Sequence, residues 1–198
     1  MTDNVFESMA KRYDTKDRKA LATIIIKEIR QALSGHAYRS MLDYGSGTGL
    51  VGLEFTDMFD RVTLADASEQ MVQITQTKID DAGLLHVEAV QLDLTQEQTN
   101  VEADVIIISL VLIHVPEVDS LLSALYKVMT PGGRLVVVDF DKNHNVHHPK
   151  LHNGFAHDEI RGLLLEAGFT PTDDRTFHEG EQLFMKQDAS MFIATGSR

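Results

Sequence analysis

The chain has 198 residues, a formal net charge of −12 at pH 7 and no cysteine. Its length accommodates one domain with a full core but not a second large domain. The lack of cysteine excludes disulfides, thiolate zinc sites and a cysteine nucleophile, and the acidic balance opposes binding to the phosphates of DNA or RNA. We therefore expect a single domain, 1–198, that acts on a small molecule.

The first residues of the chain are polar. Met1 to Asp17 contains no apolar segment like that of a secretory signal, and no apolar run approaches the roughly 20 residues of a membrane span. The basic residues between Lys11 and Lys19 are interrupted by Asp14 and Asp17, as on a solvated helix face. We expect a cytoplasmic protein without a membrane span, either a monomer or a homodimer.

An amphipathic helix is predicted over Lys16 to Ser34, because Leu21, Ile25 and Ile29 recur at helical spacing. Short apolar strands and helices then alternate. The strand candidates are Ser40–Gly45, Arg61–Asp66, Val87–Leu92, Asp104–Ser109 and Arg134–Phe140. The helices between them are predicted to begin near Thr48, Ser68, Thr95 and Pro116. This alternation predicts a parallel sheet with helices on both faces.

The pattern changes near the C-terminus. A last helix, with Ile160 and Leu164 facing inward, is predicted to end at Gly168. Two strand candidates follow it without a helix between them, Thr170–His178 and Ala189–Thr195, so they must pair antiparallel. The predicted fold is α/β, a doubly wound, mostly parallel sheet that ends in an antiparallel hairpin.

The segment Leu42-Asp-Tyr-Gly-Ser-Gly-Thr-Gly-Leu50 ends an apolar run in alternate glycines. Glycine has no Cβ, so the backbone can turn sharply out of a strand and a ligand can approach it closely. A helix is predicted over Leu50 to Met58, and its free N–H groups together with the turn would receive an anionic group. An ordinary tight turn is the alternative.

Ligands of such sheets bind beyond the carboxyl ends of the strands, where Asp43, Asp66, Asp93 and Ser109 are expected. A pair of unit charges about 4 Å apart interacts by roughly 4 kcal/mol at an effective dielectric constant of about 20. Three acids therefore favour the cationic S-adenosylmethionine over an anionic dinucleotide. The competing signal is the segment 47–52, which spells the dinucleotide fingerprint G-x-G-x-x-G, with Asp66 about where a ribose-binding acid belongs.

Over nearly its whole length the chain resembles the class I S-adenosylmethionine-dependent methyltransferases, particularly the small-molecule group with ubiquinone- and menaquinone-type enzymes. The segments that carry the resemblance are Leu42–Leu50, Leu64–Met71, Gln91–Leu94, Ile108–His114, Pro131–Gly133 and Glu166–Phe169. The resemblance implies a Rossmann-like, seven-stranded fold. It also implies S-adenosylmethionine as the methyl donor, with S-adenosylhomocysteine as the product.

The resemblance assigns cofactor contacts to Asp43, Gly45, Ser46, Gly47, Gly49, Asp66, Ala67, Met71, Asp93, Leu94 and Ser109. In the family the acid at 66 binds the ribose hydroxyls, Met71 lies against adenine and Asp93 lies near the adenine amino group. Phe6 and Ala10–Asp14 resemble the opening helix, which implies a helical cap, 1–34, over the cofactor. Tyr13 would then cover the sulfonium; the alternative is that it only packs its helix.

His114 follows the fourth predicted strand and titrates near neutrality, which makes it the candidate catalytic base. It could instead cap the helix at Pro116 or fill the pocket wall. The loop 141–157 contains His144, His147, His148, His152 and His157. This loop could contact substrate, ligate a metal or be solvated, but its spacing matches no standard zinc pattern, so we expect no metal site.

The resemblance implies transfer of a methyl group to an N, O, S or C atom of a small molecule. Much of the rate enhancement would come from alignment and from exclusion of water. The sequence leaves two alternatives. One is an NAD-dependent oxidoreductase with a dinucleotide fold, and the other is a domain that binds S-adenosylmethionine without turnover.

Overall fold

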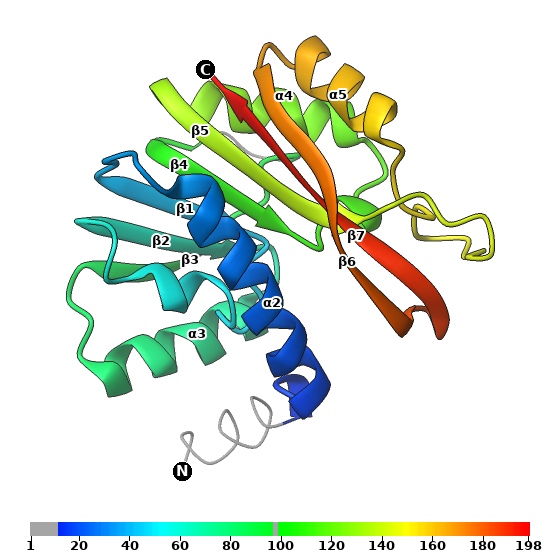
Figure 1. Ribbon diagram of the computed structural model, residues 1–198. Coiled ribbons are helices and arrows are strands. Elements are labelled where there is room, and N and C mark those ends of the chain that lie inside the picture. The colour runs from blue at the N-terminus through cyan, green and yellow to red at the C-terminus, as the bar shows by residue number, and fades with distance from the viewer. Residues whose placement is uncertain (1–11, 97–98) are drawn as a thin grey trace.

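The computed structural model describes residues 12–96 and 99–198, so the predictions on Phe6, Ala10 and Lys11 lie outside the described residues. Seven strands form one sheet in the order β3-β2-β1-β4-β5-β7-β6 (Figure 1). The strands are β1 Ser40–Tyr44, β2 Arg61–Asp66, β3 Val87–Gln91, β4 Ala103–Ser109, β5 Met129–Phe140, β6 Thr170–Phe184 and β7 Gln187–Ser197. The helices are α2 Lys16–Leu33, α3 Glu69–Ala82, α4 Val118–Val128 and α5 His157–Glu166.

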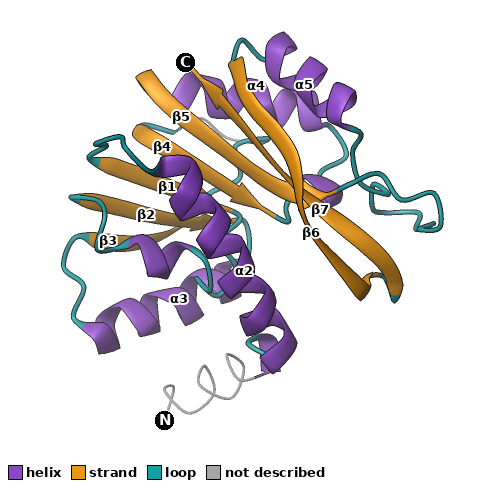
Figure 2. Cartoon of the chain, viewed as in Figure 1, coloured by secondary structure: helices purple, strands orange, loops and turns teal. Residues whose placement is uncertain are grey.

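The strands β1 to β5 run parallel, whereas β7 pairs antiparallel with both β5 and β6. Helices α2 and α3 cover one face of the sheet and α4 and α5 the other (Figures 1 and 2). The predicted doubly wound sheet with a terminal hairpin is therefore confirmed. None of the helices in the described part of the chain has the length and apolar character that crossing a membrane requires.

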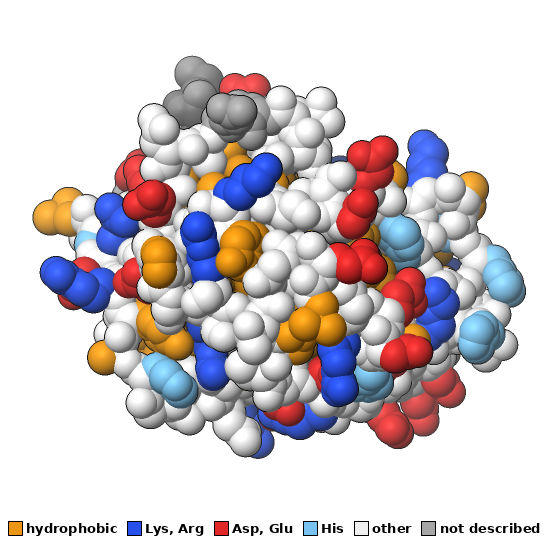
Figure 3. Space-filling model, turned by 90° about the horizontal axis from the view of Figure 1, so that it is seen from above, with side chains coloured by type: hydrophobic (Ala, Val, Ile, Leu, Met, Phe, Trp, Pro, Cys, Tyr) orange, Lys and Arg blue, Asp and Glu red, His pale blue; other side chains and the backbone are white. Residues whose placement is uncertain are grey.

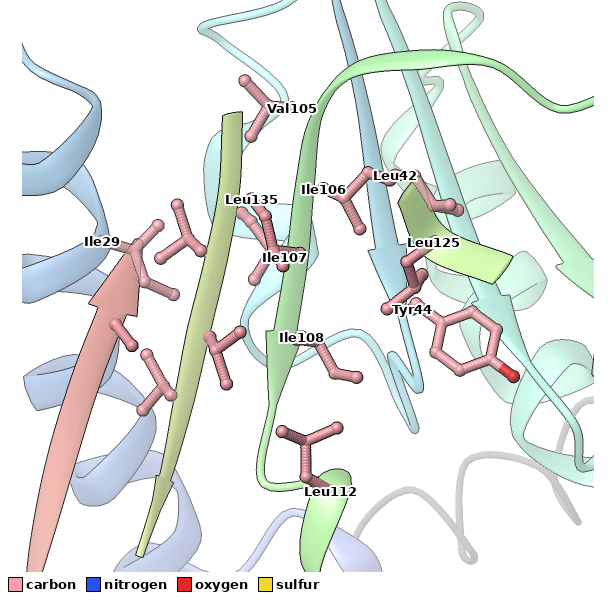
Figure 4. Packing of buried hydrophobic residues seen from close by; sticks show 14 of the residues in the cluster. Ile29, Leu42, Tyr44, Val105, Ile106, Ile107, Ile108, Leu112, Leu125 and Leu135 are labelled. Carbon is pink, nitrogen blue, oxygen red and sulfur yellow. The ribbon is translucent and has the colours of Figure 1, made fainter. Parts of the chain in front are cut away.

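The core is built around β4, whose residues 105–108 are fully buried because helices cover both faces of the sheet. Figure 4 shows Ile106 on the side of Leu125 from α4 and Ile107 on the side of Ile29 from α2. From β1 the chain continues to β2 and β3 on one side, while β4 and β5 lie on the other. This reversal opens a crevice at the carboxyl ends of β1 and β4, which is where such sheets bind ligands.

Two predicted helices are wrong. Instead of a helix over Leu50 to Met58, the chain forms a short 3₁₀-helix, Gly52–Phe55. Gly52 packs so closely against Asp43 and Leu64 that an added Cβ would lie 2.4 Å from each of them. Near Thr95 the described residues form a turn rather than a helix, because the Asp93 carboxylate accepts the N–H and hydroxyl of Thr95.

Other predicted boundaries are close to the observed ones. The helix predicted to begin near Ser68 is α3, whose N-cap is Ser68, and α2 ends one residue before the predicted Ser34. The helix expected near Pro116 begins at Val118. The strands of the hairpin are longer than predicted, because their pairing extends beyond the apolar runs into polar residues.

Two carboxyl groups are buried beneath the crevice. Asp139 in β5 is completely buried, and its oxygens accept the N–H groups of Phe140 at 2.9 Å and Ile113 at 3.3 Å. Asp43 in β1 is 2% exposed. Burial raises the pKa of each carboxyl from 3.8 to about 7, because the charged form loses its hydration.

We predict that Asp139 makes the stability fall as the pH rises from about 4 to about 7. Its pKa is higher in the folded chain than in the unfolded one, so the folded state binds the proton more tightly in this range. Between pH 5 and pH 7 the stability of Asp139→Asn relative to the unsubstituted chain should rise by about 2 kcal/mol. Urea unfolding at several pH values measures this, with Asp57→Asn as the exposed control. A pH-independent difference would contradict the prediction.

Candidate functional site

Two adjoining pockets lie at the carboxyl ends of the central strands. The first, of about 610 Å³, is here called the N-terminal pocket because Tyr13 and α2 line it. The second, of about 420 Å³, is called the acidic pocket because Asp66 and Asp93 line it. Leu110 and His114 line both, so the two pockets meet at the segment that follows β4.

The structure distributes the predicted site residues over both pockets. Tyr13, Ser46, Gly47, Met71 and Ser109 line the N-terminal pocket. Gly45, Asp66, Ala67 and Asp93 line the acidic pocket, and His114 lines both. Asp43, Gly49 and Leu94 line neither of them. Met71, which the resemblance places against adenine, therefore faces the pocket of Tyr13 rather than that of Asp93.

The loop after β1 crosses the end of β2, because Gly45 and Ser46 both donate their N–H groups to the carbonyl of Ala65, at 2.8 and 2.9 Å. Gly45 has a φ of +76°, a conformation that favours glycine. A Cβ at this position would lie 2.3 Å from the side chain of Val111. Glycine is therefore required here for two reasons, the turn and the close approach of the segment after β4.

Asp66 connects the glycine loop to α3. One oxygen of its carboxylate accepts the N–H of Gly47 and the other accepts that of Ser68, both at 2.8 Å. Ser68 in turn caps α3 by accepting the N–H of Met71 at 3.4 Å. Each carboxylate oxygen has a second lone pair, so Asp66 can accept a ligand hydroxyl while it holds the loop.

Asp43 lies beneath the glycine loop rather than in a pocket. The N–H of Gly52 bonds to its carboxylate and lowers the pKa, but burial outweighs this bond, and the nearby charge of Asp66 raises the pKa further. Its Oδ2 atom is buried and has no hydrogen-bond partner among the described residues. The sequence predicts three acids at one crevice. The structure brings Asp66 and Asp93 together in the acidic pocket, whereas Asp43 is buried beneath the glycine loop and lines neither pocket.

Leu94 does not line either of the two pockets but supports a residue that does. It is buried, and its N–H donates to the hydroxyl of Tyr44 at 3.1 Å. Tyr44 itself lines the acidic pocket, next to Asp93. Leu94 therefore fixes a pocket residue instead of facing the pocket.

Two residues that the sequence does not single out shape the segment after β4, namely Leu110 within it and Asp139 in β5. Leu110 has a φ of +58°, a left-handed conformation that costs of order 1 kcal/mol or more outside glycine. Its N–H donates to Val138 at 2.8 Å, and the carboxylate of Asp139 binds the N–H groups of residues 111–113. An acid inside the apolar run Leu135–Phe140 was the sequence signal for this support.

His114 stands where the pockets meet. Partial burial lowers its pKa below the usual 6.5, because the charged imidazolium loses hydration. The neutral ring therefore predominates at neutral pH and can accept a proton. The N-cap of α4 is Glu117, and no side-chain hydrogen bond caps that helix, so the alternative of a capping His114 is wrong.

The histidines of the loop 141–157 lie outside both pockets. His152 attaches the loop to the segment after β4, with Nε2 2.8 Å from the carbonyl of Val115. His157 lies between Asp141 and Asp174, at 3.4 and 3.2 Å. In the face shown in Figure 3, histidine and acidic side chains gather on the right-hand side of the view. Within residues 12–96 and 99–198, no group of three or more His, Asp or Glu side chains is placed to hold a metal ion.

Solved structures share this fold. The chain matches the N-methyltransferase NodS from Bradyrhizobium japonicum, crystallised with S-adenosylhomocysteine, with a TM-score of 0.73 and 18% identity over 93% of this chain and 89% of that one. It matches the [4+2]-cyclase SpnF with a TM-score of 0.74 and 18% identity over 88% of this chain and 80% of that one. At these identities the matches show the fold alone, and the two proteins are named for two different reactions.

Sequence comparison is more specific. The chain is 31% identical over 156 residues to the ubiquinone/menaquinone biosynthesis C-methyltransferase UbiE of Serratia proteamaculans, which is 72% of this chain and 60% of that protein. The relative from Escherichia fergusonii is 32% identical over 157 residues, with the same coverage. The match thus spans 60% of the length of these curated relatives. A profile of the ubiE/COQ5 methyltransferase family matches residues 1–173, and the chain belongs to that family.

Proposed function

We propose that this chain transfers a methyl group from S-adenosylmethionine to a small molecule. The observation that carries the proposal is the junction of two unlike pockets at Leu110 and His114. One pocket has carboxylates and polar backbone for a nucleoside. The other is lined largely by apolar side chains and Tyr13, as suits a second reactant.

The residues present fit the methyl donor. Asp66 and Asp93 both line the acidic pocket, and their carboxylates can accept hydrogen bonds from sugar hydroxyls and an amino group. The unpartnered Oδ2 of Asp43 adds negative charge beneath the loop when ionised, which favours a cationic ligand.

A dinucleotide fits less well. Its anionic pyrophosphate would lie at the glycine loop, where the Asp66 carboxylate already accepts the N–H of Gly47. Dinucleotide folds place this group at the N-terminus of an α-helix, whereas the glycine loop here leads into a 3₁₀-helix of 4 residues. Both the charge and the missing helix oppose the oxidoreductase alternative.

S-adenosylmethionine supplies, when bound, a methyl group on a cationic sulfur that a nucleophile can attack in line. The chain's own contribution is to align the acceptor and exclude water, for which the apolar side chains of Leu21, Ile25 and Leu110 are suited. Tyr13 lines the same pocket, and an aromatic ring stabilises a cation that lies over its face. Neutral His114 would accept the acceptor's proton where the nucleophile carries one.

The proposal also includes a cytoplasmic location, a monomeric or homodimeric state and a single domain. Residues 12–34 would form part of the cap over the cofactor, since Tyr13 and α2 line one pocket. The loop 141–157 would lie on the acceptor side, because His152 attaches it to Val115 beside His114. Light scattering after size-exclusion chromatography measures the oligomeric state.

The ligand preference tests the proposal directly. We predict that calorimetric titration gives binding of S-adenosylmethionine and S-adenosylhomocysteine and none of NAD. A screen of phenols, amines and thiols with a labelled methyl donor then tests turnover. Binding of NAD with no response to the other two ligands would overturn the proposed function.

Asp66 should be the strongest cofactor contact of the acidic pocket. We predict that Asp66→Asn weakens S-adenosylhomocysteine binding by about 10- to 100-fold, because hydrogen bonds to a charged group contribute roughly 1.5–3 kcal/mol. Asp60→Asn, at an exposed carboxylate paired with Arg39, is the matched control. Equal affinities for the two variants would remove Asp66 from the site.

His114 should affect transfer more than binding. For an acceptor that keeps its proton, we predict that His114→Gln lowers the transfer rate by about 10²- to 10⁴-fold and leaves S-adenosylhomocysteine affinity within about threefold. The rate of the unsubstituted chain should rise with pH through the lowered pKa of His114, below 6.5, and then level off. His86→Gln is the control, since the side chain of His86 is exposed, lies outside both pockets and has Nε2 2.8 Å from the carbonyl of Thr56. An unchanged pH profile in His114→Gln would contradict the role of a base.

A further inference from the structure

Three consecutive residues join the N-terminal segment to α2, and each has a different contact. Tyr13 lines the N-terminal pocket, and its carbonyl accepts a hydrogen bond from the guanidinium of Arg18 at 3.1 Å. Thr15 caps α2 by accepting the N–H of Arg18 at 3.3 Å. Asp14, between them, turns inward, and its side chain is only 8% exposed.

Asp14 contacts two elements that are distant in the sequence. Its Oδ1 accepts the hydroxyl of Thr48 at 2.5 Å, and its Oδ2 accepts the ammonium of Lys78 in α3 at 2.7 Å. The same ammonium donates to the carbonyl of Thr48 at 2.6 Å. Thr48 lies within the glycine loop, so one shielded ion pair connects the N-terminal segment, the loop and α3.

This ion pair differs from the surface pairs of the protein. The Lys78 side chain is 28% exposed, whereas the side chains of Arg39 and Asp60 are 86% and 70% exposed. Exposed pairs contribute little because water and salt screen them. A shielded pair with charge-assisted hydrogen bonds holds its geometry, and removing one partner leaves the other charge without compensation.

We infer that Asp14 is a positioning residue that fixes Tyr13 against the glycine loop through Thr48 and Lys78. The inference rests on the proposed function. Asp66 and Asp93 place the nucleoside in the acidic pocket, so the amino-acid part of the cofactor extends past Leu110 toward the N-terminal pocket. The Asp14–Lys78 pair therefore acts on the amino-acid part of the cofactor and leaves the nucleoside part unaffected.

Two ligands separate these parts. S-adenosylhomocysteine has the amino-acid group, and 5′-methylthioadenosine has the same nucleoside without it. We expect Lys78→Met to weaken binding of the first at least tenfold and of the second less than twofold in calorimetry. Asp14→Asn should act in the same direction and serves where Lys78→Met folds poorly by circular dichroism. Arg39→Met removes one positive charge at an exposed pair and should change neither affinity.

The remaining outcomes are distinct. If both ligands lose affinity by the same factor, the ion pair only stabilises the loop and the inference is overturned. The same holds if S-adenosylhomocysteine affinity is unchanged in both variants. Failure of the unsubstituted chain to bind S-adenosylhomocysteine would overturn the proposed function itself, and the inference with it.

Discussion

The glycine loop after β1 and the segment after β4 are irregular in backbone, yet their buried N–H groups need hydrogen-bond acceptors. The site depends on how the chain supplies these acceptors. The glycine loop and the segment after β4 approach each other so closely that Gly45 contacts Val111. A buried carboxyl group supports each segment from below. Asp43 binds the N–H of Gly52, and Asp139 binds those of residues 111–113. Water cannot reach these groups, so side-chain oxygens take its place.

The same arrangement determines the charge of the site. Asp43 and Asp66 lie close enough that the charge of one raises the pKa of the other. Each oxygen of the Asp66 carboxylate accepts one backbone N–H, from Gly47 in the loop and from Ser68 at the start of α3. The groups that shape the site are therefore also the groups that would bind a ligand. A cation relieves the repulsion between such acids, and an anion increases it. Structural support and preference for a cationic cofactor are therefore consequences of the same carboxylates.

The fold was largely predictable, because strands buried on both faces need continuous apolar runs, as in residues 105–108, and because two strands without a crossover helix must form a hairpin. The site was predictable where a residue type has one local use, as with Gly45. Prediction failed where the apolar periodicity of residues 50–58 indicated a helix: the chain forms only a short 3₁₀-helix there, and Gly52 packs closely against Asp43. It also missed Asp14 and Lys78, which are separated by 64 residues, since no local pattern reveals a contact at that distance.

The fold leaves the chemistry open, since a structure named as a cyclase shares it with named methyltransferases. In this chain the two pockets are built differently, and this difference bears on specificity. The acidic pocket is lined by residues at the ends of β1 and β2 and in the loops after β1 to β4. The N-terminal pocket takes Leu21, Ala22 and Ile25 from α2, which comes before the sheet in sequence and which Asp14 joins to the glycine loop. Under the proposed function, substitutions on α2 would therefore reshape the acceptor pocket while the carboxylates of the donor pocket stay in place.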